Sequence, residues 1–349
     1  MIVIGTDTHK DTHTCAIVRR ETGELLATAT RPARNDGFEQ LLLWTRKHAP
    51  SDEPRVWAIE DCRHVSGSLE RFLLARGERA VRVSAYLTAG GRKTARERGK
   101  SDTIDATAVA RVALAEGIEN LPVAILDEAS REMRLLVDHR QSLVKQRTRA
   151  QNKLRWFLHD RWPDLVVPAG GLDRIKWLDL LARKLARTDQ TADIRICRDL
   201  LNQIRAHTRR VHELEREIAA LVADYAPGLL DVVGIGPVTA ARLIGETANV
   251  HRLKSDAAFA RMSGVAPIPA SSGRTDRHRL DRGGNRQLNC AIHRIAVTQG
   301  RIHPPAREYL ARRQARGDSR KDAIRALKRQ LARVIYNALK VTTPIPDLT

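Results

Sequence analysis

The chain has 349 residues, of which 42% are hydrophobic, and it carries a formal net charge of +20. This composition excludes a wholly disordered chain, and because no apolar run reaches about 18 residues the sequence predicts no membrane span. The positive charge favours a polyanionic partner, although a ribosome-like or chromatin-like binder fits it as well as an enzyme does.

Residues 1–122 alternate between strand and helix patterns. Short apolar runs over 2–7, 14–19 and 25–30 predict three strands, the last two joined by a hairpin turn. The later elements are expected in this order: helix 36–49, strand 56–60, helix 69–75, strand 80–83 and helix 102–116. This α/β pattern predicts a mixed sheet with flanking helices, and its order resembles an RNase H-like fold.

Residues 123–226 predict a long helical coiled-coil region. Apolar residues recur at spacings of three and four from Met133 to Phe157 and again from Ile204 to Tyr225. The two helices form either an antiparallel hairpin within the chain or a contact between subunits.

The first of these helices carries a basic run. Residues 139–155 contain six lysines and arginines and no acid. We interpret the run as a face that follows phosphates, with Arg140, Arg147 and Lys153 as nucleic-acid contacts. A solvated helix face is the alternative interpretation.

Residues 227–349 form a third, all-α and basic region, with 18 lysines and arginines against 6 acids over 263–349. The stretch 230–244 matches a helix-hairpin-helix pattern, in which Gly234 and Gly236 would let backbone amides approach a phosphate. A tight helical hairpin without a ligand is the alternative.

Four acids indicate a metal-dependent site. Asp7 and Glu60 end predicted strands, while Asp102 and Asp105 lie three residues apart at the start of a helix and share one face. Converging carboxylates repel one another unless divalent cations neutralise them, and Mg²⁺ or Mn²⁺ prefers such oxygen ligands. Each acid alone has a structural alternative, and Asp102 fits a helix N-cap.

A histidine pair offers a weaker metal site. His9 and His13 lie four residues apart, a spacing that suits a helix, but the stretch runs from a loop into a strand.

A Pro- and Gly-rich loop near residue 270 carries a candidate nucleophile. Ser271 and Ser272 precede Gly273, and the cations that could hold a phosphate follow: Arg274, Arg277, Arg279 and Arg282. No base for a serine is evident nearby, so from the residues alone an ordinary turn is the favoured interpretation.

Together these motifs resemble the DEDD-type insertion-sequence transposases, the family that includes the Piv DNA invertase. The segments around Asp7, Glu60 and Asp102–Asp105 are similar to its acidic motifs, and 264–285 is similar to its C-terminal signature. The resemblance covers nearly the whole chain, but Asp61-Cys62 replaces the small residues that usually follow the glutamate.

The resemblance implies a bacterial DNA recombinase of the cytoplasm and nucleoid. A RuvC-like domain would hold Mg²⁺ or Mn²⁺ through the four acids, and a C-terminal serine would attack DNA and form a phosphoserine link. The family pattern indicates Ser272, with Ser271 as the adjacent alternative. It also implies a structured guide RNA, and dimers that pair into tetramers. The domains would be 1–122, 123–226 and 227–349.

Two other functions fit parts of the sequence. A RuvC-like junction endonuclease would use the four acids and a water molecule without serine chemistry. A non-catalytic nucleic-acid scaffold would need neither the acids nor the serine.

Overall fold

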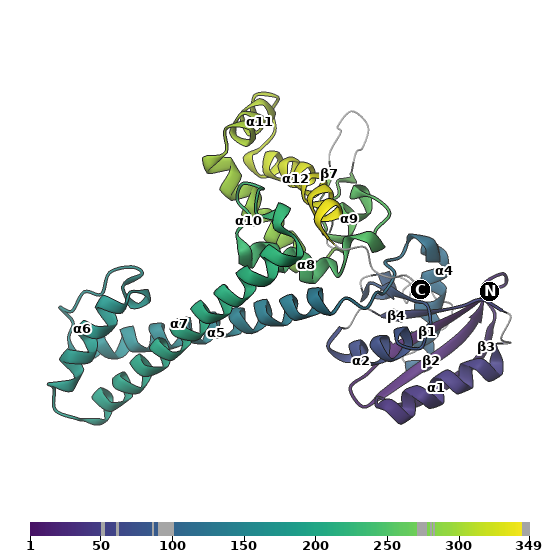
Figure 1. The fold of residues 1–349 in the computed structure, drawn as a ribbon, viewed down its shortest axis with the longest axis horizontal. Helices are drawn as coiled ribbons and strands as arrows, with labels where there is room; N and C mark the ends of the chain where they lie inside the picture. The colour runs from purple at the N-terminus through teal and green to yellow at the C-terminus, as the bar shows by residue number, and fades with distance from the viewer. Residues whose placement is uncertain are drawn as a thin grey trace.

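The computed structural model describes residues 1–49, 53–60, 63–85, 87–89, 101–270, 278–279, 281 and 283–343. Along the chain follow a sheet with its helices, a long two-helix arm and a group of C-terminal helices (Figure 1). None of the helices in these ranges is long and apolar enough to cross a bilayer.

The N-terminal part is built on a five-stranded sheet of order β3-β2-β1-β4-β5. The strands are β1 (Ile2–Thr8), β2 (Thr12–Arg19), β3 (Leu25–Pro32), β4 (Arg55–Glu60) and β5 (Ala80–Val83). Strand β2 pairs antiparallel with both β1 and β3, whereas β4 and β5 run parallel to β1. This mixed sheet confirms the α/β prediction and is compatible with an RNase H-like domain.

Helices cover both faces of the sheet. On one face α1 (Asn35–His48) and α2 (Arg63–Leu74) pack against a cluster that contains Trp57, and on the other α4 (Asp102–Glu116) packs against valines of the strands. Because β1 is buried on both faces, it begins with a continuous apolar run over residues 2–4 rather than an alternating pattern. The bounds of α4 are those predicted from the sequence, while α2 begins six residues earlier than predicted.

The middle of the chain is an antiparallel hairpin of two helices, each 34 residues long. They are α5 (Glu128–Arg161) and α7 (Ala192–Tyr225), and α6 (Ile175–Ala186) lies at the far end of the arm (Figure 1). At about 1.5 Å per residue each helix extends roughly 50 Å. The intramolecular form of the predicted coiled coil is therefore present, and contact between subunits stays a prediction.

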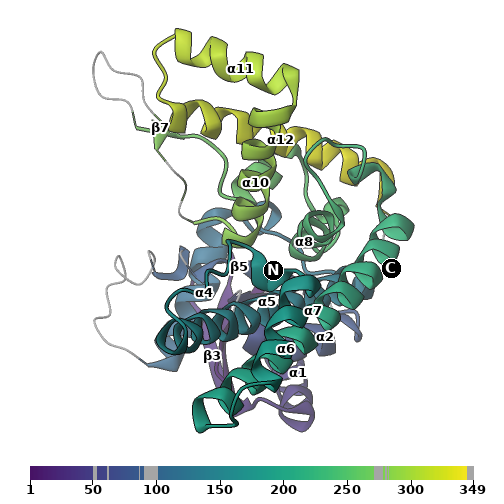
Figure 2. The ribbon, with the colours of Figure 1, turned by 90° about the vertical axis from the view of Figure 1, so that its left-hand side faces the viewer.

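The C-terminal helices are α8 (Pro237–Thr247), α9 (Asp256–Met262), α10 (Arg286–Ile302), α11 (Pro304–Ala315) and α12 (Arg320–Thr342), with a short ribbon of β6 (Ile268–Pro269) and β7 (His278–Arg279). Their apolar core also contains Met133 and Val222, so the base of the arm belongs to it (Figure 2). Gly245 lets α8 cross α5 closely, because a Cβ there would lie 2.7 Å from that of Arg134.

The predicted helix-hairpin-helix is only partly formed. Its second helix is α8, which begins directly after Gly236, and Gly234 adopts the positive φ of +87° that favours glycine. The first helix is reduced to the 3₁₀ turn η3 (Pro227–Leu229), since Pro227 and Gly228 directly follow the end of α7 and leave few residues before the glycines.

The chain leaving the sheet is tied to the C-terminal helices by one buried side chain. The guanidinium of Arg252 donates to the carbonyl of Val123, at 3.1 Å, and to that of Thr247, at 2.7 Å. Arg252 closes the 3₁₀ turn η4 (Val250–Arg252) between α8 and α9. The sheet and the C-terminal helices are therefore joined by hydrogen bonds as well as by the arm.

Candidate active site

Asp7 lies at the edge of the sheet where β1 ends. In the parallel pair of β1 and β4, Thr6 faces Ile59, so the next positions along the two strands are Asp7 and Glu60. Both carboxylates are buried. Burial raises the pKa of Asp7, and the charges of Asp105 and Glu60 raise it further, while His9 lowers it.

The first turn of α4 brings two more acids to this edge. Asp105 is buried, whereas the side chain of Asp102 is 55% exposed. Ser101 is the N-cap, because its hydroxyl accepts a hydrogen bond from the backbone amide of Ile104 at 3.3 Å. The alternative interpretation of Asp102 as the cap is therefore wrong, and its carboxylate is available to the site.

Glycine at position 5 is what lets α4 approach β1 so closely. A Cβ on Gly5 would lie 2.1 Å from the carbonyl oxygen of Ala106 and 2.5 Å from the backbone nitrogen of Ala110. The helix thus rests directly on the strand, which places Asp105 within electrostatic range of Asp7.

His9 joins the acids, a role that the sequence analysis considered only in combination with His13. Its Nε2 lies 3.1 Å from Oδ2 of Asp7 and 3.4 Å from Oδ1 of Asp102. Ligand atoms of these three residues all lie within 4.8 Å of one another. The sequence indicates this role of His9 through its position, two residues after the acid at the end of a buried strand.

His13 is a core residue rather than a ligand. Its ring stacks on that of Phe38, with centroids 5.5 Å apart, and burial lowers its pKa to about 4. The paired site of His9 and His13 is therefore not formed, because the chain between them is the turn that joins β1 to β2 and not a helix.

Glu60 is held in place by a hydrogen bond from the hydroxyl of Thr88. The buried carboxylates of Glu60 and Asp105 raise the pKa of Asp7, and together the acids form a donor set of hard oxygens with excess negative charge. Such a set fits a divalent cation of the Mg²⁺ or Mn²⁺ type, which takes oxygen ligands and would relieve the repulsion.

The candidate serines lie outside the described residues. Three of the four predicted arginines also lie outside them. The residues concerned are Ser271, Ser272, Arg274, Arg277 and Arg282. Arg279 is described and is an exposed residue of β7, paired in register with Ile268.

The glycines of the C-terminal signature have a structural explanation. A Cβ on Gly284 would lie 2.1 Å from the backbone nitrogen of Gly264, so the segments on either side of the serines touch backbone to backbone. Asn285 then caps α10, accepting hydrogen bonds from the amides of Gln287 and Leu288.

Two of the three basic residues predicted on α5 are engaged within the arm. Arg140 donates to Glu215 of α7 at 2.8 Å, and Arg147 lies 3.4 Å from Asp173. Acids of other segments thus pair with the cations of the acid-free run on α5. The sequence around the run does not show these partners. Lys153 is exposed, and its contact with nucleic acid stays a prediction.

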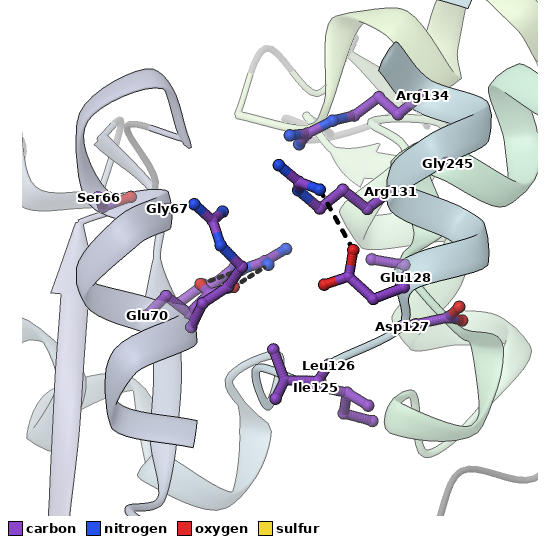
Figure 3. A pocket seen from close by; sticks show the side chains of 13 residues that line it. Ser66, Gly67, Glu70, Ile125, Leu126, Asp127, Glu128, Arg131, Arg134 and Gly245 are labelled. Atoms are coloured by element: carbon purple, nitrogen blue, oxygen red, sulfur yellow. Dashed lines mark hydrogen bonds and ion pairs between the residues drawn. The ribbon is translucent and has the colours of Figure 1, made fainter. Parts of the chain in front are cut away.

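A narrow cleft separates α2 from the base of the arm (Figure 3). It has a volume of about 60 Å³ and is lined by charged side chains. Glu70 pairs with Arg82 at 2.7 Å, and Arg131 pairs with Glu128 at 3.2 Å. None of the four predicted acids lines this cleft, so it is distinct from the site at the edge of the sheet.

Comparison with known proteins gives the class and then the family. A model described as a transposase, of the DEDD type of IS110, matches residues 4–163, and a model described as "Transposase IS116/IS110/IS902 family" matches residues 226–311. These matches define a transposase of the DEDD type, and the sheet with its clustered acids is compatible with that class. The chain belongs to the IS116/IS110/IS902 family of transposases.

Individual relatives cover most of the chain. An uncharacterized 44.8 kDa protein of insertion element IS116 from Streptomyces clavuligerus is 26% identical, across 100% of this chain and 98% of that protein. An uncharacterized 42 kDa protein of IS900 from Mycobacterium paratuberculosis is 24% identical, across 96% and 95%. An uncharacterized 43.6 kDa protein of IS110 from Streptomyces coelicolor is 27% identical, across 69% and 71%.

Proposed function

We propose that this protein moves an insertion sequence by cutting DNA and rejoining it through a phosphoserine intermediate. The observation that carries the cutting step is the gathering of acids at one edge of the sheet. Asp7, His9 and Asp102 place ligand atoms within 4.8 Å of one another, and Glu60 and Asp105 act on the pKa of Asp7.

The four acids Asp7, Glu60, Asp102 and Asp105 would hold Mg²⁺ or Mn²⁺. When bound, the cation supplies positive charge that stabilises the attacking and leaving oxygens of a phosphoryl transfer. The protein holds the donors ready: the hydroxyl of Thr88 orients Glu60, and His9 bridges Asp7 and Asp102.

The serine step follows from the family resemblance. The hydroxyl oxygen of Ser272, or of Ser271, forms a bond to phosphorus while the bond from phosphorus to a sugar oxygen breaks. The serine loses its proton and the departing sugar oxygen gains one. Because a phosphodiester is retained, a hydroxyl of another strand can reverse the step without a nucleotide cofactor.

The partners we propose are DNA and a structured guide RNA. The net charge of +20 supports a polyanionic partner, and base pairing with a guide would supply sequence recognition that backbone contacts do not. We further propose a dimer that pairs into a tetramer. Location in the cytoplasm, on the nucleoid, stays a prediction.

A junction endonuclease is the second candidate. One observation favours it: the four acids all come from β1, β4 and α4, so the described site gathers without any residue of the C-terminal region. In that case a water molecule would replace the serine.

The test is incubation of the protein with DNA that carries its element junction, in the presence of Mg²⁺. We expect mass spectrometry to find a nucleotide adduct on the peptide with Ser271 and Ser272, and single alanine variants to identify the nucleophile. Cleavage that persists when both serines are alanine would establish the endonuclease instead. DNA binding without cleavage in the wild-type protein, unchanged in an Asp102→Ala variant, would establish a scaffold.

A further inference from the structure

A second cavity lies among the C-terminal helices. It has a volume of about 790 Å³, and its walls are the segment 264–267, β7, the end of α11 and the first half of α12. The segment 264–267 precedes the candidate serines in the chain and β7 follows them. The cavity is therefore bordered by both stretches of chain that lead to the proposed nucleophile.

Lys328 of α12 is a cation that lines this cavity and is only 6% exposed. Its ammonium donates to Oδ1 of Asn289 at 2.7 Å. The amide of Asn289 in turn donates to the carbonyls of Ser263 and Gly264, at 3.1 Å and 2.8 Å. The lysine is thereby fixed to the segment that enters the serine loop.

Neighbouring cations of the cavity are neutralised, but Lys328 is not. Arg325 pairs with Asp322 at 2.8 Å, and Arg329 pairs with Asp256 at 3.0 Å. Among the residues that the structure describes, no carboxylate lies within ion-pair distance of Lys328, whose partner is a neutral amide. Burial lowers the pKa of Lys328, and the charge of Arg325 lowers it further.

A buried charge without a counter-charge is costly, and ionisable groups perturbed in this way cluster at functional sites. The surroundings select the ligand: the region is strongly basic, and Arg279 stands exposed at the wall. We propose that Lys328 binds a non-bridging oxygen of a DNA backbone phosphate, so that this cavity holds the strand beside residues 264–267 and β7. The proposal depends on the proposed function for its ligand.

The test measures how the affinity for a short DNA duplex changes with salt concentration. Each phosphate contact contributes about 0.9 to the slope of log affinity against log salt, whatever the sequence. We expect Lys328→Met to reduce the slope by about 1 and Lys328→Arg to retain it. Lys340→Met is the matched control, because Lys340 is an exposed lysine of the same helix outside the cavity.

A merely structural lysine gives a different result. Lys328→Met would then lower the melting temperature and leave the slope unchanged, which overturns the proposal, as does an equal change of slope in Lys340→Met. If the variant does not fold, reductive methylation of the wild-type protein decides: DNA must protect the Lys328 amine and leave that of Lys340 reactive.

The two proposals can fail separately. An unchanged slope in Lys328→Met, together with a serine adduct in the wild-type protein, rejects the phosphate site and leaves the transposase mechanism standing. A reduced slope in Lys328→Met, together with no serine adduct in the wild-type protein, supports the phosphate site and rejects the serine mechanism.

Discussion

At the scale of single residues, the approach of Asp105 to Asp7 depends on the absence of a side chain at position 5. Gly5 allows the backbone of α4 to touch that of β1, and Asp105 stands on the turn that makes this contact. The serine at position 101 takes over the capping of the helix, which leaves Asp102 to the site. Neither contact involves a catalytic group, yet both decide where catalytic groups lie.

Substitution of Gly5 by alanine should destabilise the fold and displace α4. Because the new Cβ would meet backbone atoms that cannot move aside, we expect a loss of about 1–3 kcal/mol in the free energy of unfolding in urea. Gly67→Ala is the control: its Cβ would meet only the tip of Arg71, at 3.4 Å, so it should be neutral or gain up to about 1 kcal/mol. Equal losses in both variants would contradict this reading of Gly5.

Asp7 should reduce stability at neutral pH when no cation is present. Its pKa is raised above the ordinary value of 3.8, so the folded protein holds the proton more tightly than the unfolded chain does. The contribution of the Asp7 carboxyl group to the free energy of unfolding is therefore present at low pH. It is lost as the pH rises through the raised pKa.

We therefore expect Asp7→Asn to melt about 2 °C or more above the wild-type protein at pH 7 in a chelator, and to match it below pH 3.8. Added Mg²⁺ should raise the melting temperature of the wild type more than that of Asp7→Asn. A variant that melts lower in the chelator at pH 7 would show that the carboxylate is stabilising.

At the scale of elements, the start of α5 is joined to the end of α7 by one acid. The carboxylate of Asp127 caps α5 through the amide of Ser130, at 3.0 Å, and accepts a hydrogen bond from the hydroxyl of Tyr225. The two long helices are thus fixed to each other where they enter the C-terminal core.

Removal of this acid should loosen the base of the arm. We expect Asp127→Ala to lower the free energy of unfolding by about 1–2 kcal/mol, the usual effect of a lost cap. Asp127→Asn keeps a capping oxygen and should cost less. Hydrogen exchange should rise in the first turn of α5 and the last of α7, and an increase confined to the tip of the arm would disagree with this assignment.

The elements also show what the sequence could predict. The bounds of α4 and the order of strands and helices along the chain followed from local apolar periodicity, which the sheet and its covering helix satisfy directly. Local periodicity failed where partners come from afar: Glu215, 75 residues along the chain, neutralises Arg140. Helix α6 was not predicted, although Leu178, Leu181 and Leu185 have helical spacing and pack into the tip of the arm.

At the scale of the whole molecule, the arm presents apolar side chains near its far end. Trp156 is 74% exposed, Val166 is 76% exposed and Ile175 is 69% exposed. Apolar side chains that form an exposed patch often mark a surface of contact with another molecule. They support a contact between copies of the chain at the arm.

Light scattering should therefore find a dimer on DNA, and Trp156→Ala should shift the equilibrium toward the monomer by tenfold or more, which is about 1.4 kcal/mol. Exposed Leu43 lies on α1 of the sheet part, and Leu43→Ala is the control with no effect on assembly. A wild-type protein that stays monomeric on DNA would refute the subunit contact.

The hydrogen bonds of Arg252 have a consequence for the control of transposition. Since they fasten the exit of the sheet to the helices beyond the arm, they restrain bending between these two parts of one copy. We propose that the acids of one copy therefore act together with the serine of another copy. Activity would rise steeply with the number of copies in the cell, and an isolated copy would leave the host chromosome intact.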